Sequence, residues 1–457
     1  MIVSFNPATG EELARFEPHD GASIELRLAL ASRAQQAWRR MPMAERLLAL
    51  RRIALQLREE KHALALMITL EMGKPLTEAL GEVEKCASSF DFYAEAAPAM
   101  LADEVVTSGA SDSRIVRDPI GLVLAVMPWN YPLWQVMRAA APVLAAGNGL
   151  VLKHASNVPQ CALAIEAMCR RAGLPEGLLT TLLVGAAQVP ALIADERISA
   201  VTFTGSTPAG RSIAAAAGQA LKKQVLELGG SDPFIVLADA DIEAAAAVAV
   251  RARFQNTGQS CIAAKRFIVE QVVADRFVDA FCAHARQLVI GDPLAAGTTQ
   301  GTMARLSLRD ELDVQVQASL REGARLLLGG RAVPGAGSYY EPTVLDHVLP
   351  EMTAAREETF GPVAAILRVG DVDEALRVAN GTPFGLGAAL WTADLERAAC
   401  LAHQIEAGAV FINGIVASDP RLPFGGIKAS GYGRELGRLG LQEFTNAKTV
   451  WTGPARN

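Results

Sequence analysis

The sequence predicts an α/β protein, and three observations support this fold class. Apolar residues recur at helical spacing between residues 22 and 100, as in AERLLALRRIALQLREEKHALALMITLEMG, which predicts long amphipathic helices. From Arg114 onward, short apolar runs such as LVLAVMP and ISAVTFTG end at Pro or Gly, as strands do. These runs alternate with helical stretches such as PQCALAIEAMCRRAGLP, the pattern of buried parallel strands in βαβ units.

Length and composition limit the classes of function. A chain of 457 residues that is 51% hydrophobic is long enough for about two or three domains. The net charge of -6 provides no basic surface for nucleic acid or anionic lipid, so we expect neither as a partner. Six scattered cysteines without a CxxC pair indicate no metal site and favour a reducing cytoplasm.

Neither the first residues nor the longest apolar stretch has the pattern of a targeting or membrane segment. The first residues, MIVSFNPATGEELARF, lack the basic and then apolar stretch of a secretory signal. The longest apolar stretch, residues 139 to 152, contains Pro and Gly and is too short to span a bilayer. We therefore expect a cytoplasmic protein without a membrane partner.

A cysteine, a glutamate and an asparagine are candidates for catalysis. Cys261 follows a turn in FQNTGQSC, where a nucleophile could meet a substrate, although an isolated cysteine is more often a small buried apolar residue. Glu227 lies between leucines in VLELGG, where burial would raise its pKa and suit a general base; a surface glutamate is the alternative. Asn130 in VMPWNYP could complete an oxyanion hole with the Cys261 N–H, or simply form a turn.

Six motifs occur in one order along nearly the whole chain, and together they resemble the aldehyde dehydrogenase superfamily. They are MPWNYP, FTGSTPAG, LELGG, NTGQSC, EETFGPV and PFGGIKASGYGRE. The resemblance implies Cys261 as the nucleophile, Glu227 as the general base and Asn130 as the oxyanion donor. It also implies oxidation of an aldehyde to an acid through a thiohemiacetal and then a thioester on Cys261.

The segment FTGSTPAG predicts a dinucleotide site. Gly205 and Gly210 lie around an expected turn from strand to helix, where free N–H groups at the helix start can face a pyrophosphate. An ordinary helix cap by Ser206 or Thr207 is the alternative. The resemblance implies the following residues near the cofactor, with the glutamate holding the nicotinamide ribose: Trp129, Lys153, Gly205, Ser206, Leu228, Glu358 and Phe360.

Residue 156 bears on the choice of cofactor. Members of the superfamily that prefer NAD commonly have a glutamate three residues after the lysine, where it repels the 2′-phosphate of NADP. This chain has Ser156 at that position, in KHAS. We therefore expect the cofactor to be NADP or NAD, with NADP accepted.

Three residues suggest a substrate that carries a carboxylate. Arg138 lies in an apolar helix that we expect to be buried, and Ser418 precedes the PFGG motif by a short loop. Both resemble positions of the bacterial succinate semialdehyde dehydrogenases. The second arginine expected in those enzymes is Gln255 here, and we suggest that Arg421 compensates. A structural salt bridge is the alternative role for Arg138.

The resemblance also implies an architecture. We expect a Rossmann-like cofactor domain (residues 1–105 and 127–228), an α/β catalytic domain (229–417) and a small β oligomerisation element (106–126 and 418–457), in a homodimer or homotetramer. The specific function expected is NAD(P)-dependent oxidation of succinic semialdehyde. A broad-specificity aldehyde dehydrogenase is the main alternative; a CoA-acylating enzyme or a catalytically silent homologue is disfavoured because Cys261, Glu227 and Asn130 are all present.

Overall fold

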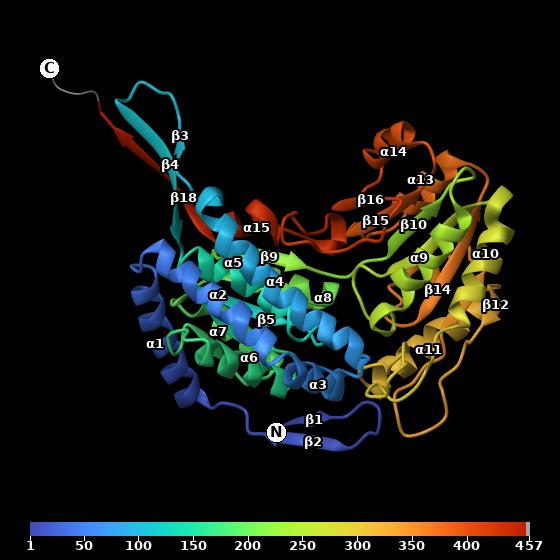
Figure 1. Cartoon of the computed structure of the whole chain (residues 1–457), viewed down its shortest axis with the longest axis horizontal. Helices are drawn as coiled ribbons and strands as arrows, with labels where there is room; N and C mark the ends of the chain where they lie inside the picture. Colours follow the sequence, from blue (N-terminus) through green and yellow to red (C-terminus); the bar gives the residue numbers. More distant parts are fainter. Residues whose placement is uncertain (454–457) are drawn as a thin grey trace.

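The structure is a computed structural model that describes residues 1–453. The last four residues of the expected 418–457 segment lie outside the described residues. Two sheets built mainly of parallel strands lie next to each other, with helices on their faces (Figure 1). The α/β class predicted from the sequence is confirmed.

The first sheet has six strands in the order β17-β9-β8-β5-β6-β7. Its central strands are mostly apolar and buried on both faces, as expected for a sheet covered by crossover helices. All but β17, which pairs antiparallel with β9, run parallel. The strands are β5 (Leu122–Met127), β6 (Gly149–His154), β7 (Leu179–Thr181), β8 (Ile198–Thr204), β9 (Lys223–Glu227) and β17 (Gly431–Tyr432).

Long helices cover this sheet, and the helical periodicity of residues 22 to 100 is confirmed. The first helix is capped by Asp20, whose carboxylate accepts from the Ser23 N–H at 2.8 Å. The helices are α1 (Gly21–Trp38), α2 (Met43–Glu59), α3 (Lys61–Met72), α4 (Leu76–Met100), α5 (Trp134–Ala145), α6 (Pro159–Arg171), α7 (Val189–Ala194) and α8 (Thr207–Gln219), with a short 3-10 turn at Ala186–Gln188.

The second sheet has seven strands in the order β12-β13-β14-β11-β10-β15-β16, parallel except for β12. Its strands are β10 (Asp232–Val236), β11 (Ala264–Glu270), β12 (Arg325–Leu328), β13 (Thr343–Asp346), β14 (Val363–Val369), β15 (Gly387–Trp391) and β16 (Ala409–Ile412). Its helices are α9 (Ile242–Phe254), α10 (Gln271–Ala285), α11 (Leu306–Arg321), α12 (Thr353–Arg356), α13 (Val372–Asn380) and α14 (Leu395–Ala402).

Two smaller sheets complete the fold. Strands β1 (Ile2–Phe5) and β2 (Glu12–Phe16) form a hairpin, and β18-β4-β3 form an antiparallel arm that stands out from the body (Figure 1). The arm consists of β3 (Glu104–Val105), β4 (Asp112–Pro119) and β18 (Thr445–Thr452); helix α15 (Gly437–Glu443) and a 3-10 turn at Lys428–Ser430 precede β18.

The sheets divide the chain differently from the expected domain boundaries. Strand β5 falls largely within the 106–126 segment, yet it lies at the centre of the six-stranded sheet. Strand β17 of the 418–457 segment joins the same sheet, whereas β3 of the expected cofactor domain joins the arm. A sheet can include strands that are far apart along the chain, so boundaries drawn along the sequence need not coincide with the sheets. The division into functional domains stays a prediction.

The two large sheets meet at edges that carry the candidate site. Asn130, Gly205 and Glu227 follow or end strands at the carboxyl edge of the six-stranded sheet. Cys261 and Glu358 precede strands at the amino edge of the seven-stranded sheet. Across the described residues, no helix is long and apolar enough to cross a membrane.

Candidate active site

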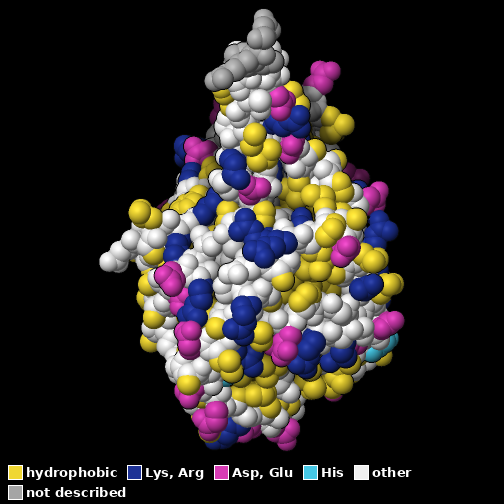
Figure 2. All heavy atoms as spheres, turned by 90° about the vertical axis from the view of Figure 1, so that its left-hand side faces the viewer, with side chains coloured by type: hydrophobic (Ala, Val, Ile, Leu, Met, Phe, Trp, Pro, Cys, Tyr) yellow, Lys and Arg dark blue, Asp and Glu magenta, His cyan; other side chains and the backbone are white. Residues whose placement is uncertain are grey.

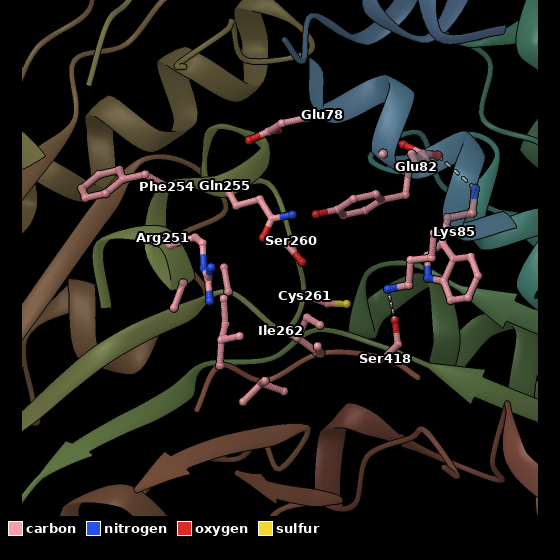
Figure 3. Close-up of a pocket in the computed structure, with 18 of the residues that line it drawn as sticks. Glu78, Glu82, Lys85, Arg251, Phe254, Gln255, Ser260, Cys261, Ile262 and Ser418 are labelled. Carbon is pink, nitrogen blue, oxygen red and sulfur yellow. Dashed lines mark hydrogen bonds between the residues drawn. The ribbon is translucent and has the colours of Figure 1, made fainter. Parts of the chain in front are cut away.

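A cavity of about 780 Å³ contains the candidate nucleophile. Its wall comes from helices α4, α5 and α9, from the loop that carries Cys261 and from the loop after β16 (Figure 3). Cys261 lies in the middle of the view, with its sulfur directed toward the side where Lys85 and Ser418 lie. The structure therefore brings together residues that are more than 300 positions apart in the sequence.

The loop before Cys261 has an unusual backbone. Asn256 and Thr257 both have a φ of 56°, and Gly258 has a φ of +70°. A Cβ atom at Gly258 would approach the carbonyl oxygen of Gly361 to 2.3 Å, so this position requires glycine. The Asn256 N–H donates to the Glu78 carboxylate at 2.9 Å and stabilises the turn. The NTGQSC motif is thus a strained turn that presents the thiol to the cavity.

Lys265 holds the other end of this loop. Its buried Nζ donates to the backbone oxygens of Ser260 (3.1 Å), Cys261 (2.9 Å) and Ala263 (3.2 Å). It also lies 3.7 Å from the Glu358 carboxylate. Because an ammonium group has three donors, all of them are used, and the backbone around the nucleophile is fixed.

Glu227, the candidate base, ends β9 and is buried. Neither of its carboxylate oxygens has a hydrogen-bond partner within residues 1–453. Burial, with the nearby Glu435 carboxylate, holds the pKa of Glu227 well above the ordinary value of 4.5, although Arg138 and Arg434 lower it. A Cβ at Gly425, which has a φ of +156°, would come within 2.8 Å of Glu227 Oε1. The PFGG motif therefore leaves room for this carboxylate.

The thiol of Cys261 needs a base. Burial raises its pKa to about 12, against the opposing effect of Arg138 and Lys265. At neutral pH the sulfur therefore carries a proton, and a nearby unpaired carboxylate of high proton affinity is the kind of group that can accept it.

Asn130 lies beside the Cys261 loop. Its Nδ2 donates to the backbone carbonyl of Gln259 at 3.0 Å, and the backbone carbonyl of Asn130 accepts from Asn256 Nδ2 at 2.9 Å. Since an amide nitrogen carries two hydrogens, a second donor remains for a substrate oxygen. The side chain is held by the same turn that presents the nucleophile.

Arg138 lines the cavity from α5, but its guanidinium is held by protein groups. It forms a buried ion pair with Glu435, and its Nη2 donates to Thr204 Oγ1 at 3.3 Å. The guanidinium also lies 4.9 Å from the centre of the Phe424 ring. The alternative role considered for this arginine, a structural salt bridge, is therefore present, and the partner Glu435 was missed in the sequence.

Ser418 and Arg421 have different locations. Ser418 is buried in the cavity wall, where its Oγ accepts from Lys85 Nζ at 2.7 Å (Figure 3). Arg421 is exposed over 73% of its side chain, pairs with Asp419 and is absent from the cavity wall. The suggestion that Arg421 compensates for Gln255 therefore needs correction, because its chain segment directs it to the surface. Lys85 supplies the positive charge beside Ser418.

The turn after β8 could hold a phosphate. Ser206 is the N-cap of α8, but its side chain makes no capping hydrogen bond, so the first N–H groups of the helix stay available. Leu228 packs against Gly210 in the first turn. At the end of β6, Lys153 is half-buried and Ser156 is exposed. These residues share the carboxyl edge of one sheet, which suits a dinucleotide.

The remaining cofactor candidates come from two motifs that are far apart in the sequence. Phe360 packs edge to face against Trp129, with ring centres 5.8 Å apart. Glu358 Oε1 accepts from the Gly230 N–H at 3.0 Å, which orients the carboxylate that the resemblance assigns to a ribose. The two motifs MPWNYP and EETFGPV are thereby brought together.

Three site residues were missed by the sequence reasoning, namely Lys85, Lys265 and Glu435. The apolar run KRFIVE begins with a lysine, which is a weak signal for a buried charge. Glu435 lies in the GYGRE motif, but the motif itself does not indicate which group this carboxylate pairs with. Lys85 has no such signal because it lies on a helix with many charged residues.

Comparisons with known proteins agree with this geometry. The model of the aldehyde dehydrogenase family matches residues 1–450. The chain is 51% identical over 450 residues to a probable succinate-semialdehyde dehydrogenase [NADP(+)] of Synechocystis, covering 98% of this chain and 99% of that one. It is also 51% identical to the succinate semialdehyde dehydrogenase [NAD(P)+] Sad of Escherichia coli, covering 98% and 97%.

Solved structures give the same result. Succinic semialdehyde dehydrogenase from Streptococcus pyogenes, solved in complex with NADP+ as the cofactor, superposes with a TM-score of 0.97 at 37% identity. The comparison covers 99% of this chain and 100% of that one. With the family model matching almost the whole chain and relatives near half identity, this protein is an enzyme that belongs to the aldehyde dehydrogenase family.

Proposed function

We propose that this enzyme oxidises succinic semialdehyde to succinate with NADP or NAD as the cofactor. The observation that carries the proposal is one cavity that contains the Cys261 thiol together with a cationic, hydroxyl-bearing wall at Arg138, Lys85 and Ser418. Such a wall suits an aldehyde with a distal carboxylate. The names of the relatives from Synechocystis, Escherichia coli and Streptococcus pyogenes support the same substrate.

The first chemical step uses the unpaired carboxylate of Glu227. It takes the thiol proton, and Cys261 Sγ forms a bond to the aldehyde carbon while the carbonyl π electrons move to its oxygen. The Asn130 amide and the Cys261 N–H donate to that oxygen in the resulting thiohemiacetal. The nicotinamide cofactor, when bound, supplies the acceptor for the hydride that leaves the carbon.

The second half of the reaction releases the acid. Loss of the hydride leaves a thioester on Cys261, and Glu227 releases the thiol proton to solvent. The ionised Glu227 then removes a proton from a water molecule as the water oxygen attacks the thioester carbon. The carbon–sulfur bond breaks, the acid leaves, and Glu227 returns its proton to the Cys261 thiolate. Glu227 thus serves twice, which agrees with its buried and unpaired state.

The cofactor residues proposed are Lys153, Ser156, Ser206 and Glu358. Without a carboxylate at residue 156, the edge of the cofactor site has no negative charge to repel a 2′-phosphate, and the half-buried Lys153 ammonium would attract it. We therefore expect NADP to bind at least as tightly as NAD, as measured by titration with each cofactor. A large preference for NAD would contradict this part of the proposal.

The direct test compares succinic semialdehyde with butanal, a neutral aldehyde of equal carbon number. With NADP present, kcat/KM for the acid should exceed that for butanal by at least about tenfold, the effect of one charge-assisted hydrogen bond. Cys261→Ala should abolish both reactions. Equal rates for the two aldehydes would overturn the specific assignment and leave the thiol chemistry intact.

A broad-specificity aldehyde dehydrogenase is the second candidate. The cavity volume of about 780 Å³ favours it, because this space exceeds what a four-carbon substrate fills. In that case butanal and larger aldehydes would react as fast as the acid. The same pair of rate measurements separates the two functions.

We also propose that the arm formed by β3, β4 and β18 mediates self-association. It exposes large apolar side chains, with Val105 73% and Trp451 56% exposed. Figure 2 views the face beside this arm, where hydrophobic side chains lie among lysines and arginines. A sedimentation experiment would test whether the chain forms a dimer or tetramer, and deleting residues 445–457 should then yield a monomer.

A further inference from the structure

A corner of the cavity is built from three segments far apart in the sequence. Lys85 extends from α4, and its Nζ donates to Oγ of Ser418, in the loop after β16, at 2.7 Å. The same Nζ lies 4.4 Å from the centre of the Trp134 ring on α5. All three residues line the cavity that contains Cys261 (Figure 3).

Lys85 and Ser418 carry hydrogen-bond donors that the bond between them does not use. The ammonium group uses one of its three hydrogens on Ser418, and because the serine oxygen accepts there, its own O–H remains free to donate. A carboxylate at this corner can therefore receive one bond from Lys85 and one from Ser418. Charge-assisted bonds of this type are among the strongest in proteins.

The acidic side chains near Lys85 are already paired with other cations. Glu82 binds Lys74 and accepts from the N–H groups of Leu133 and Trp134. Asp419 forms a two-bond pair with Arg421, at 2.8 and 2.5 Å. Within residues 1–453, no carboxylate lies within ion-pair distance of Lys85. Its charge is therefore available to a ligand.

Arg138 is in the opposite situation. Its ion pair with Glu435 is buried on both sides, and Glu435 also accepts from Thr202 at 3.0 Å. If the guanidinium turned to a substrate, the Glu435 carboxylate would lose its cation inside the protein, which is strongly unfavourable. The charge of Arg138 is thus already balanced by Glu435, next to Glu227.

We propose that Lys85 is the residue that selects aldehydes bearing a distal carboxylate, with Ser418 as the second donor, while Arg138 serves to hold Glu435 beside the general base. This inference rests on the proposed oxidation of succinic semialdehyde and names the group that binds its carboxylate. It moves the principal cation from the arginine suggested by resemblance to a lysine on another helix.

The pH dependence of KM provides a second test of the role of Lys85. Burial, followed by the positive charge of Arg138, lowers the pKa of Lys85 to about 8; Cys86 and Glu82 on its own helix and Asp419 on the facing loop act in the opposite direction. Above that pH, free Lys85 loses its proton and its charge. KM for succinic semialdehyde should then rise with pH, while KM for butanal should not follow it.

The test is Lys85→Met, assayed with NADP on succinic semialdehyde and on butanal. The ratio of kcat/KM for the acid to that for butanal should fall about 50-fold, mostly through KM. Lys85→Arg should recover most of the preference and move the rise of KM to higher pH. Arg251→Gln removes a different, exposed cation of the same cavity wall and is the matched control; it should change the ratio by less than about threefold.

The outcomes separate the two proposals. If the unmodified enzyme shows no preference for the acid, the proposed function fails. If it shows the preference and Lys85→Met keeps it, the assignment of Lys85 is overturned. Turnover of butanal and the unfolding temperature report whether each variant is folded, and a Lys85→Met protein that fails both is replaced by Lys85→Gln. Loss of the preference in Arg251→Gln, with Lys85 intact, would also overturn the assignment.

Discussion

Lys265 and Glu227 are both buried near Cys261, but they differ in how many of their donors or acceptors form hydrogen bonds. Lys265 donates all three of its hydrogens to backbone oxygens of the nucleophile loop. Glu227 is equally buried, but both of its carboxylate oxygens lack a partner within residues 1–453. A saturated group fixes the position of its neighbours, whereas an unsaturated buried group keeps its affinity for a proton. We therefore expect Lys265 to maintain the geometry of the site and Glu227 to take part in the chemistry.

The largest expected effect is on the rate when Glu227 is changed. Glu227→Gln keeps the shape of the side chain and removes the base, so kcat should fall by about a thousandfold, within the usual range for a general base. The unfolding temperature should stay the same or rise, because a buried carboxylate without a partner is removed. Steady-state kinetics and calorimetry on the same sample provide both values. A marked loss of stability would show that Glu227 has a structural role as well.

Lys265→Met should produce the converse result. Three backbone oxygens lose their charged donor, so the free energy of unfolding should decrease by about 3 kcal/mol, measured by denaturant titration. Activity should fall too, because the loop of Cys261 loses its support. An unchanged unfolding free energy would contradict the distinction between the two groups.

The pH profile of the rate tests the role of Glu227 in this comparison. Glu227 accepts a proton only when ionised, and burial raises its pKa, so kcat for butanal should increase with pH along an acidic limb whose midpoint lies above 4.5. Glu227→Gln should lose this limb. Glu78 is the matched control because it is a carboxylate that lines the cavity containing Cys261, and burial raises its pKa to about 7. Glu78→Gln should keep the limb; if it removes the limb instead, Glu78 is the titrating base.

The smallest effect is expected at Arg421. Its side chain is mostly exposed and pairs with Asp419 outside the cavity wall, so Arg421→Ala should leave kcat and KM for succinic semialdehyde within about twofold. Surface ion pairs of this kind contribute little. A large increase in KM would return Arg421 to the substrate site, for example through the contact of two subunits.

The sequence by itself determined the fold class, the family and the candidates for the catalytic residues. The periodicity of residues 22 to 100 and the short apolar runs after Arg114 determined the α/β class, since burial requires those patterns. The motifs determined the family and the candidates Cys261, Glu227 and Asn130, because strained turns and strand ends need particular residues at particular spacings. These requirements involve residues that are close together in the sequence, so they can be predicted from it.

Only the tertiary structure decided how the charges pair. Arg138 and Glu435 are almost 300 residues apart, and Lys85 and Ser418 are 333 residues apart, so no spacing in the sequence connects the members of either pair. The tertiary structure also decided the location of Arg421. Its proximity to the PFGG motif in the sequence suggested a role in substrate binding, but its side chain is exposed at the surface. Whether a buried charge is neutralised or available depends on which distant side chain packs against it. The packing of the helices against the sheet determines this pairing. It neutralises Arg138 with Glu435 and leaves the charge of Lys85 available.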